Sequence, residues 1–101
     1  MQILEMPVFT IKKGVTEKQM LEAHEKFNRE FMKKQAGYVS HSLLKRGQQW
    51  YDIAVWATEV AKDKAFSDIY KSKAALEYIE LIDSCDDADI PLFSVVKDYD
   101  A

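Results

Sequence analysis

The amino-acid sequence predicts an α+β domain whose elements follow the order strand, helix, strand, strand, helix, strand. Three observations predict this order: a capped amphipathic helix after a first strand, a tight hairpin after that helix, and a last strand after a second helical unit. This is the ferredoxin-like split βαβ arrangement. It predicts a four-stranded antiparallel sheet with both helical units on one face.

The first expected strand spans residues 3–12 and is rich in β-branched and aromatic side chains. Alternation along the strand places Glu5, Pro7 and Phe9 on the same side. Because a proline cannot donate a hydrogen bond to a neighbouring strand, either the strand is bulged at Pro7 or regular pairing on one side begins after it, and of the two we expect the bulge.

The first helix is expected to begin at Glu17 and to continue toward Gly37, which suits a left-handed cap. Thr16 and Gln19 form a capping box at its start. Apolar residues at a spacing of three and four predict one buried face. That face comprises Met20, Leu21, His24, Phe27, Phe31 and Met32.

Residues 38–57 predict one β-hairpin, in which Gly47 and Gln48 suit a two-residue turn. Because such a turn fixes the register, three cross-strand pairs are expected. They are Leu43 with Asp52, His41 with Ala54, and Val39 with Trp56.

The second strand of this hairpin carries apolar side chains on both faces, so the sheet needs two covers. The helices cover one face. The other face is more apolar than a lone soluble protein normally exposes, so we expect a homodimer that pairs sheet on sheet. The expected contact residues are Tyr38, Leu44, Tyr51, Ile53 and Val55.

The second helical unit is expected in two pieces, capped by Thr58 and Ser72. The inward residues expected are Ala61, Ala65, Phe66 and Ile69 in the first piece, and Ala75, Leu76, Ile79 and Ile82 in the second. The acidic residues 83–89 are expected to form a surface loop, and residues 91–99 a last strand begun by a proline.

Length and composition predict a single domain over residues 1–101, which are 48% hydrophobic and 31% charged. The net charge is −3 and the basic residues are scattered, so no nucleic-acid partner is expected. The sequence has neither a long apolar run nor a cleavable leader, which predicts no membrane contact and a cytoplasmic location. The single Cys85 agrees with a reducing compartment.

Three short segments carry a resemblance to a known family: Gly14-Val15-Thr16, Gln35-Ala36-Gly37-Tyr38, and Trp50-Tyr51-Asp52 with Val55-Trp56. In these, and over residues 5–99, the chain resembles the dimeric α/β-barrel proteins of the antibiotic-biosynthesis-monooxygenase type. The resemblance implies a ferredoxin-like subunit that dimerises into an α/β barrel. It also implies a pocket in each subunit, between sheet and helices, lined by the face that carries Trp56.

The family contains cofactor-free oxygenases, haem-degrading enzymes and members without a known activity. The haem-degrading branch depends on an Asn in the first strand, a Trp at the end of the third strand and a His in the second helical unit. Trp56 fits the Trp, but this sequence has neither the Asn nor the His. Haem degradation is therefore disfavoured.

The expected register places His41 diagonal to Asp52 and to Trp56 on the helix-facing side, and His24 points to the same space. A neutral histidine held by a carboxylate can abstract a proton from a phenol or an activated C–H group. Four aromatic residues are expected to wall the site and to bind a flat, apolar ligand. They are Trp50, Trp56, Phe27 and Phe31.

These residues predict a cofactor-independent monooxygenase, or a related small-molecule enzyme, that acts on an aromatic or polyketide-like compound. His41 is the expected base and Asp52 its orienting partner. No cofactor is expected, because a deprotonated electron-rich ring can itself pass an electron to oxygen. No metal is expected either, although two histidines and Asp52 do not exclude zinc or non-haem iron.

Other interpretations of the same residues stay open. His41 and Asp52 also suit a structural pair, and His24 a hydrogen-bonded core histidine. The scaffold also suits a non-catalytic module that binds or senses a small molecule. A structural interaction protein would fill the pocket with its own side chains.

Overall fold

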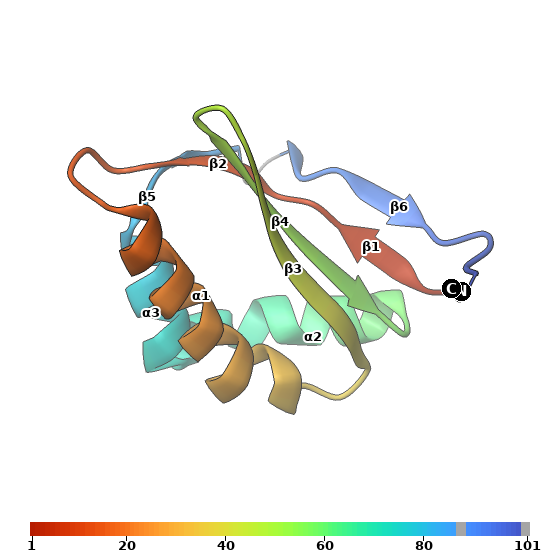
Figure 1. The fold of residues 1–101 in the computed structure, drawn as a ribbon. Coiled ribbons are helices and arrows are strands. Elements are labelled where there is room, and N and C mark those ends of the chain that lie inside the picture. Colours follow the sequence, from red (N-terminus) through yellow and green to blue (C-terminus); the bar gives the residue numbers. More distant parts are fainter. Residues whose placement is uncertain (87–88, 100–101) are drawn as a thin grey trace.

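An antiparallel sheet and a layer of helices on one side of it make up residues 1–86 and 89–99, which the computed structural model describes (Figure 1). The strands are β1 (Ile3–Glu5), β2 (Val8–Ile11), β3 (Tyr38–Arg46), β4 (Gln49–Trp56), β5 (Ile82–Cys85) and β6 (Leu92–Ser94). The helices are α1 (Glu17–Glu30), α2 (Glu59–Asp68) and α3 (Lys73–Glu80), with short 3₁₀ turns η1 (Met32–Lys34) and η2 (Ile69–Lys71). None of these helices is long and apolar enough to span a membrane.

Strand β4 lies at the centre of the sheet. It pairs with β3 on one edge and with β1 and β2 on the other, and these two pair in turn with β6 and β5. This order agrees with the expected ferredoxin-like arrangement. The expected count of four strands was wrong, because the described residues form six strand segments.

One cause of the higher count is an interruption at Pro7. The bulge expected there was wrong with respect to β4, because the register continues without a shift from Glu5 opposite Ala54 to Val8 opposite Tyr51. β1 ends at Glu5 and β2 begins at Val8. The Pro7 carbonyl still accepts a hydrogen bond from the Asp52 amide at 3.0 Å, and the Met6 amide donates to the Pro91 carbonyl at 3.0 Å. The chain therefore keeps its place in the sheet through a residue that lacks an N–H.

The other cause is β5, which pairs with β2 where a loop was expected. The prediction of a loop over residues 83–89 was wrong for Asp83 to Cys85, and residues 87–88 lie outside the described part of the chain. The acidic composition was misleading, because alternate side chains of an edge strand can face water. The last strand is shorter than expected, with only Leu92–Ser94 paired to β1.

The start of α1 is as expected: Thr16 accepts from the Gln19 amide, and the Gln19 side chain accepts from the Thr16 amide. Its end was predicted too late. Phe31 leaves helical geometry, a 3₁₀ turn follows, and Gly37 takes a positive φ of 81°. This break lets the consecutive residues Phe31 and Met32 both lie in the core. Leu21 was wrongly placed in the inward face and is 48% exposed.

The hairpin confirms two of the three expected pairs, Leu43 with Asp52 and His41 with Ala54. The third was wrong: Tyr38, not Val39, pairs with Trp56, because the register shifts between Tyr38 and Ser40. A one-residue bulge reverses the face to which the preceding side chain points.

Tyr38 consequently lies on the helix-facing side, not on the outer face where a dimer contact was expected. Its ring meets the ring of Trp56 edge-on, with centroids 6.3 Å apart. Its hydroxyl donates to Asn28 Oδ1 at 3.1 Å. Val39 takes the opposite side and is 42% exposed.

The second helical unit has the two expected caps, Thr58 for α2 and Ser72 for α3. Its inward face was predicted only in part. Ala65 and Ala75 are buried, but Phe66 and Leu76 are exposed, and Tyr78 is buried instead. Ile82 belongs to β5 and not to the helix.

Candidate functional site

A cavity of about 330 Å³ lies between the sheet and the helical layer. Apart from the thiol of Cys85, six of its lining residues carry polar side chains: Glu5, His41, Asp52, Tyr70, Tyr78 and Asp83. Much of the remaining lining is apolar, with Phe9, Phe27, Met32, Ala54, Ile69 and Ile79 among its residues. The cavity is thus an apolar space with a few polar groups, as is typical of small-molecule sites.

The strand register explains why polar groups meet here. Ala54 of β4 pairs with Glu5 of β1 on one side and with His41 of β3 on the other. Directly paired residues share a face of the sheet, so Glu5, Ala54 and His41 form one row on the helix-facing side. Asp52 lies two residues from Ala54 on β4 and therefore has the same orientation.

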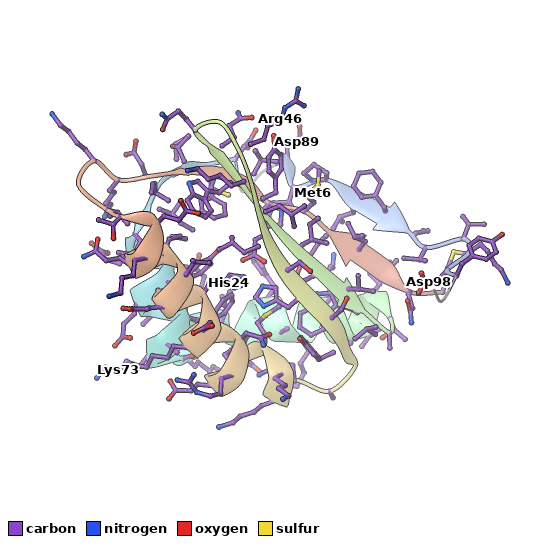
Figure 2. The ribbon with its side chains drawn as sticks, viewed as in Figure 1. Met6, His24, Arg46, Lys73, Asp89 and Asp98 are labelled. Atoms are coloured by element: carbon purple, nitrogen blue, oxygen red, sulfur yellow. The ribbon has the colours of Figure 1, made fainter. Side chains whose placement is uncertain are left out.

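His41 and Asp52 are in direct contact, with Nε2 of the histidine 2.5 Å from Oδ1 of the carboxylate. His24, labelled in Figure 2, belongs to α1. Its Nε2 lies 3.2 Å from His41 Nε2 and 3.6 Å from Asp52 Oδ2. Tyr78 of α3 donates its hydroxyl to Asp52 Oδ2 at 2.7 Å. We call these four residues, His24, His41, Asp52 and Tyr78, the polar cluster.

The second ring nitrogen of His41 is also engaged, because Nδ1 lies 3.0 Å from Asn28 Oδ1. Both nitrogens of His41 thus face an oxygen acceptor, and neither points freely into the cavity. A proton taken from a ligand would therefore enter the polar cluster as a whole, along the short contacts between His41, Asp52 and His24.

The charge of Asp52 is maintained in a buried place. Burial alone would raise the pKa of this carboxyl, but hydrogen bonds from His24 and His41 and the charge of both rings outweigh it and hold the pKa far below its ordinary value. Burial, followed by the nearby charge of Asp52, raises the pKa of the Tyr78 phenol well above 10. Tyr78 consequently stays a hydrogen-bond donor to an ionised Asp52.

Glu5 lies at the other end of the row and has a different environment. Trp56, which is 1% exposed, donates its indole N–H to Glu5 Oε1 at 2.9 Å. Burial raises the pKa of Glu5, the Trp56 hydrogen bond lowers it by less, and the charge of Asp52 raises it further. Glu5 is therefore a carboxyl whose charge is only partly compensated.

The site residues predicted from sequence lie in two places. His24, His41 and Asp52 meet as expected, and Phe27 lines the cavity. The other three expected wall residues are buried beside the cavity and do not line it. Trp56 bonds Glu5, Phe31 stacks on Phe27 with centroids 5.8 Å apart, and Trp50 has the ammonium of Lys45 5.3 Å above its ring.

Three site residues were missed: Glu5, Asn28 and Tyr78. A signal existed for each of them. Glu5 shares its strand side with the buried Phe9, Asn28 follows His24 by one helical turn, and Tyr78 follows Ala74 and Ala75 at helical spacing.

His24, His41 and Asp52 also satisfy a geometric requirement for holding a metal ion, because one ligand atom from each lies within 4.8 Å of the others. Two imidazoles and a carboxylate suit a divalent first-row metal. In this structure the same atoms bond one another, and we assign them no metal.

A scan against models of known families finds no match for this chain, and a search of curated proteins finds none either. Solved structures do match. SnoaB, a cofactor-independent oxygenase from Streptomyces nogalater, is 22% identical with a TM-score of 0.68, over 96% of this chain and 95% of that chain.

Two further structures match over nearly their full lengths. One is a protein from Chloroflexus aurantiacus J-10-fl that is provisionally named an antibiotic biosynthesis monooxygenase; it is 9% identical with a TM-score of 0.71, over 99% of this chain and 98% of that chain. The other is Rv0793 from Mycobacterium tuberculosis, which is 11% identical with a TM-score of 0.67, over 99% of this chain and 100% of that chain. The chain therefore has the fold of the antibiotic-biosynthesis-monooxygenase type, the resemblance that its sequence motifs predicted.

Proposed function

We propose that this protein is a small-molecule enzyme of the cofactor-independent oxygenase type, acting on an aromatic or polyketide-like compound in the cavity. The observation that carries the proposal is the contact between His41 and Asp52 at the wall of an apolar cavity, supported from behind by His24 and Tyr78. The likeness of the fold to SnoaB gives it further support.

The polar cluster serves as the proton acceptor in this proposal. A phenol or activated C–H group held against Asp52 and His41 loses its proton to the cluster as a whole. The anion left behind is electron-rich and reacts with dioxygen. The apolar lining favours flat substrates and keeps water from competing with them.

Oxygen consumption tests this proposal. The protein is mixed with a panel of phenols, hydroquinones and polycyclic enols, and oxygen uptake is followed with and without a chelator. We expect uptake with at least one flat substrate, unchanged by the chelator. His41→Ala, or His41→Gln if the first variant fails to fold, should lower the rate about 100-fold or more.

The matched control is Gln48→Ala, an exposed substitution in the hairpin turn that should leave the rate unchanged. A folded His41 variant that consumes oxygen at the parental rate would end the assignment. Activity that disappears with the chelator and returns with a divalent metal would point instead to metal chemistry at His24, His41 and Asp52.

A second candidate function is a binding module without catalysis. It is favoured by the fact that both ring nitrogens of His41 already have partners. Moreover, every buried side-chain polar atom in the described residues has a hydrogen-bond partner. Such a module would bind flat ligands tightly but would show no oxygen uptake with any of them.

We further propose that two copies pair through the outer face of the sheet. Tyr51, Ile53 and Val55 of β4 are all only half-buried there, and Leu44 of β3 is exposed. The bulge adds Val39 to this surface in place of Tyr38. The remaining face of the sheet is covered by the chain's own helices (Figure 1).

A further inference from the structure

Glu5 is a polar group of the cavity that the proposed mechanism does not use, as are Tyr70 and Asp83. It lies on β1, outside the polar cluster, in the row that runs from Glu5 through Ala54 to His41. Both ends of this row line the same cavity, and so does Ala54 between them.

The Glu5 carboxylate is fixed at one oxygen and available at the other. Oε1 accepts from the indole of Trp56 at 2.9 Å, and that indole is held in the core. No hydrogen bond or ion pair of the described residues engages Oε2. An oriented carboxylate with one acceptor oxygen left over is suited to receive a donor from a ligand.

The placement of Glu5 is costly for the protein alone. Burial raises its pKa and Asp52 repels its charge, while Lys62 and His41 compensate only weakly and from a distance. A partly buried carboxylate without a cationic partner destabilises a fold. Groups kept in such places are more often used for binding or catalysis than for stability.

The distance between the two ends of this row suits a ligand built on one flat ring. Neighbouring strands lie about 4.8 Å apart, so β1 and β3 are separated by about 10 Å across β4 at this level. The methyl side chain of Ala54 leaves the space between Glu5 and His41 open, and Phe27 lines it from α1. An aromatic ring over Ala54 would have Glu5 at one end, and at the other end Asp52, which contacts His41.

We propose that Glu5 is a second ligand-binding residue, so that the cavity selects flat aromatic compounds with a hydrogen-bond donor at each end, such as 1,4-dihydroxybenzenes. One hydroxyl donates to Glu5 and the other to Asp52 within the polar cluster. The proposal rests on the proposed function only for the location of the ligand. It adds the substrate class.

Anaerobic binding measured by calorimetry tests this proposal without requiring turnover. The ligands are hydroquinone, 4-methoxyphenol and 1,4-dimethoxybenzene, which carry two, one and no donors. We expect the wild-type protein to bind hydroquinone at least about tenfold more tightly than 4-methoxyphenol, because a hydrogen bond to a charged group contributes about 1.5–3 kcal/mol.

Glu5→Met keeps the size of the side chain and removes its acceptors, so the preference for hydroquinone over 4-methoxyphenol should fall below about threefold. This variant removes a poorly compensated charge but also the acceptor of the buried Trp56 indole, so circular dichroism must first show that it folds. If it does not, Glu5→Gln keeps the shape and should lose most of the preference. Glu25→Met, at an exposed position of α1, is the matched control and should keep it.

Three results would overturn the proposal: equal binding of hydroquinone and 4-methoxyphenol by the wild type, a preference that survives in folded Glu5 variants, or no binding of hydroquinone. A failure of the proposed function has a different signature. In that case hydroquinone still binds with Glu5-dependent selectivity, but the complex consumes no oxygen when air is admitted.

Discussion

At the scale of single residues, one buried carboxylate organises the site. Asp52 is ionised in the core because His41, His24 and Tyr78 all bond to it or lie close to its charge. Removing one of these partners leaves a buried charge less well compensated, and such losses cost more than the loss of a surface contact. The stability of the fold and the chemistry of the site therefore depend on the same atoms.

The hydroxyl of Tyr78 gives the first prediction. Tyr78→Phe keeps the aromatic ring and removes only the hydroxyl that donates to Asp52 Oδ2. The free energy of unfolding should therefore fall by about 1.5–3 kcal/mol. Urea denaturation followed by tryptophan fluorescence measures it. Tyr70→Phe, at a ring 59% exposed, should change stability by less than about 0.5 kcal/mol. Equal effects of the two variants would contradict the role given to Tyr78.

The pH dependence of stability gives the second prediction. The pKa of Asp52 is lower in the folded protein than in the unfolded chain, so the unfolded state binds more protons in the acid range. The contribution of Asp52 to the free energy of unfolding is complete above about pH 3.9, the pKa of this group in the unfolded chain. It is lost as the pH falls below that value. Asp52→Asn should lower stability at pH 7 by about 3–5 kcal/mol.

The difference between the wild type and Asp52→Asn should shrink as the pH falls from about 5 to 2, measured by denaturant unfolding at several pH values. Curves that stay parallel over this range would contradict the linkage. The effect of Glu5 on stability has the opposite dependence on pH. Because its pKa is raised in the folded protein, its contribution to the free energy of unfolding is largest at low pH and is lost as the pH rises through that raised pKa. Glu5→Gln should thus remove the loss of stability that begins as the pH rises above the ordinary Glu value of 4.5.

At the scale of elements, local irregularities decide what faces the cavity. The bulge before Ser40 turns Tyr38 toward Asn28, which in turn holds His41. The interruption at Pro7 leaves the register against β4 unchanged, so Glu5 and Phe9 both lie in the cavity wall. The bulge before Ser40 is therefore the irregularity that shapes the site.

Gly37 gives a prediction at this scale. It has a positive φ of 81°, and a Cβ placed on it would lie 2.5 Å from the Cβ of Ala61 on α2. Gly37→Ala should therefore add steric overlap of about 1–3 kcal/mol to the cost of the left-handed backbone. Gly47→Ala is the control, because its φ is also positive but a Cβ there meets nothing within 4 Å.

We expect urea unfolding to show a clearly larger loss of stability for Gly37→Ala than for Gly47→Ala. The reason is that the first substitution pushes α2 away from the hairpin, whereas the second strains only the exposed turn. Equal losses would mean that the close packing of α2 against Gly37 adds nothing to the stability cost of a Cβ at this position.

At the scale of the whole molecule, the two faces of the sheet have different covers. Helices cover one face (Figure 1). On the other face Leu44 is exposed, and Ile53 and Val55 are only half-buried by the described residues. The proposed pairing with a second copy would bury this surface and stabilise a small domain whose own core is limited.

Sedimentation velocity gives the prediction at this scale. The wild-type protein should sediment as a dimer at micromolar concentrations, and Ile53→Lys should sediment as a monomer because it places a charge in the proposed interface. Val60→Lys, at a position of α2 that is 78% exposed, should leave the dimer intact. A wild-type protein that stays monomeric as its concentration rises would overturn the proposed pairing.

The sequence alone determined the starts of the helices, the hairpin and the meeting of His41 with Asp52, because these depend on local rules, but it missed β5 and the end of α1. Capping at Thr16 and the turn at Gly47 fixed where α1 begins and how β3 pairs with β4, and that register brought His41 to Asp52. Residues a few positions apart carry this information, so it can be read from the chain.

Only the tertiary structure decided which further side chains complete the site. The bulge that turned Tyr38 inward, the rotation of α3 that placed Tyr78 on Asp52, and the bond from Trp56 to Glu5 all depend on packing between distant segments. A shift of one residue in a strand, or of a fraction of a turn in a helix, changes which side chain enters the cavity. Local propensity does not distinguish such alternatives, because the core selects among them through the volume it must fill.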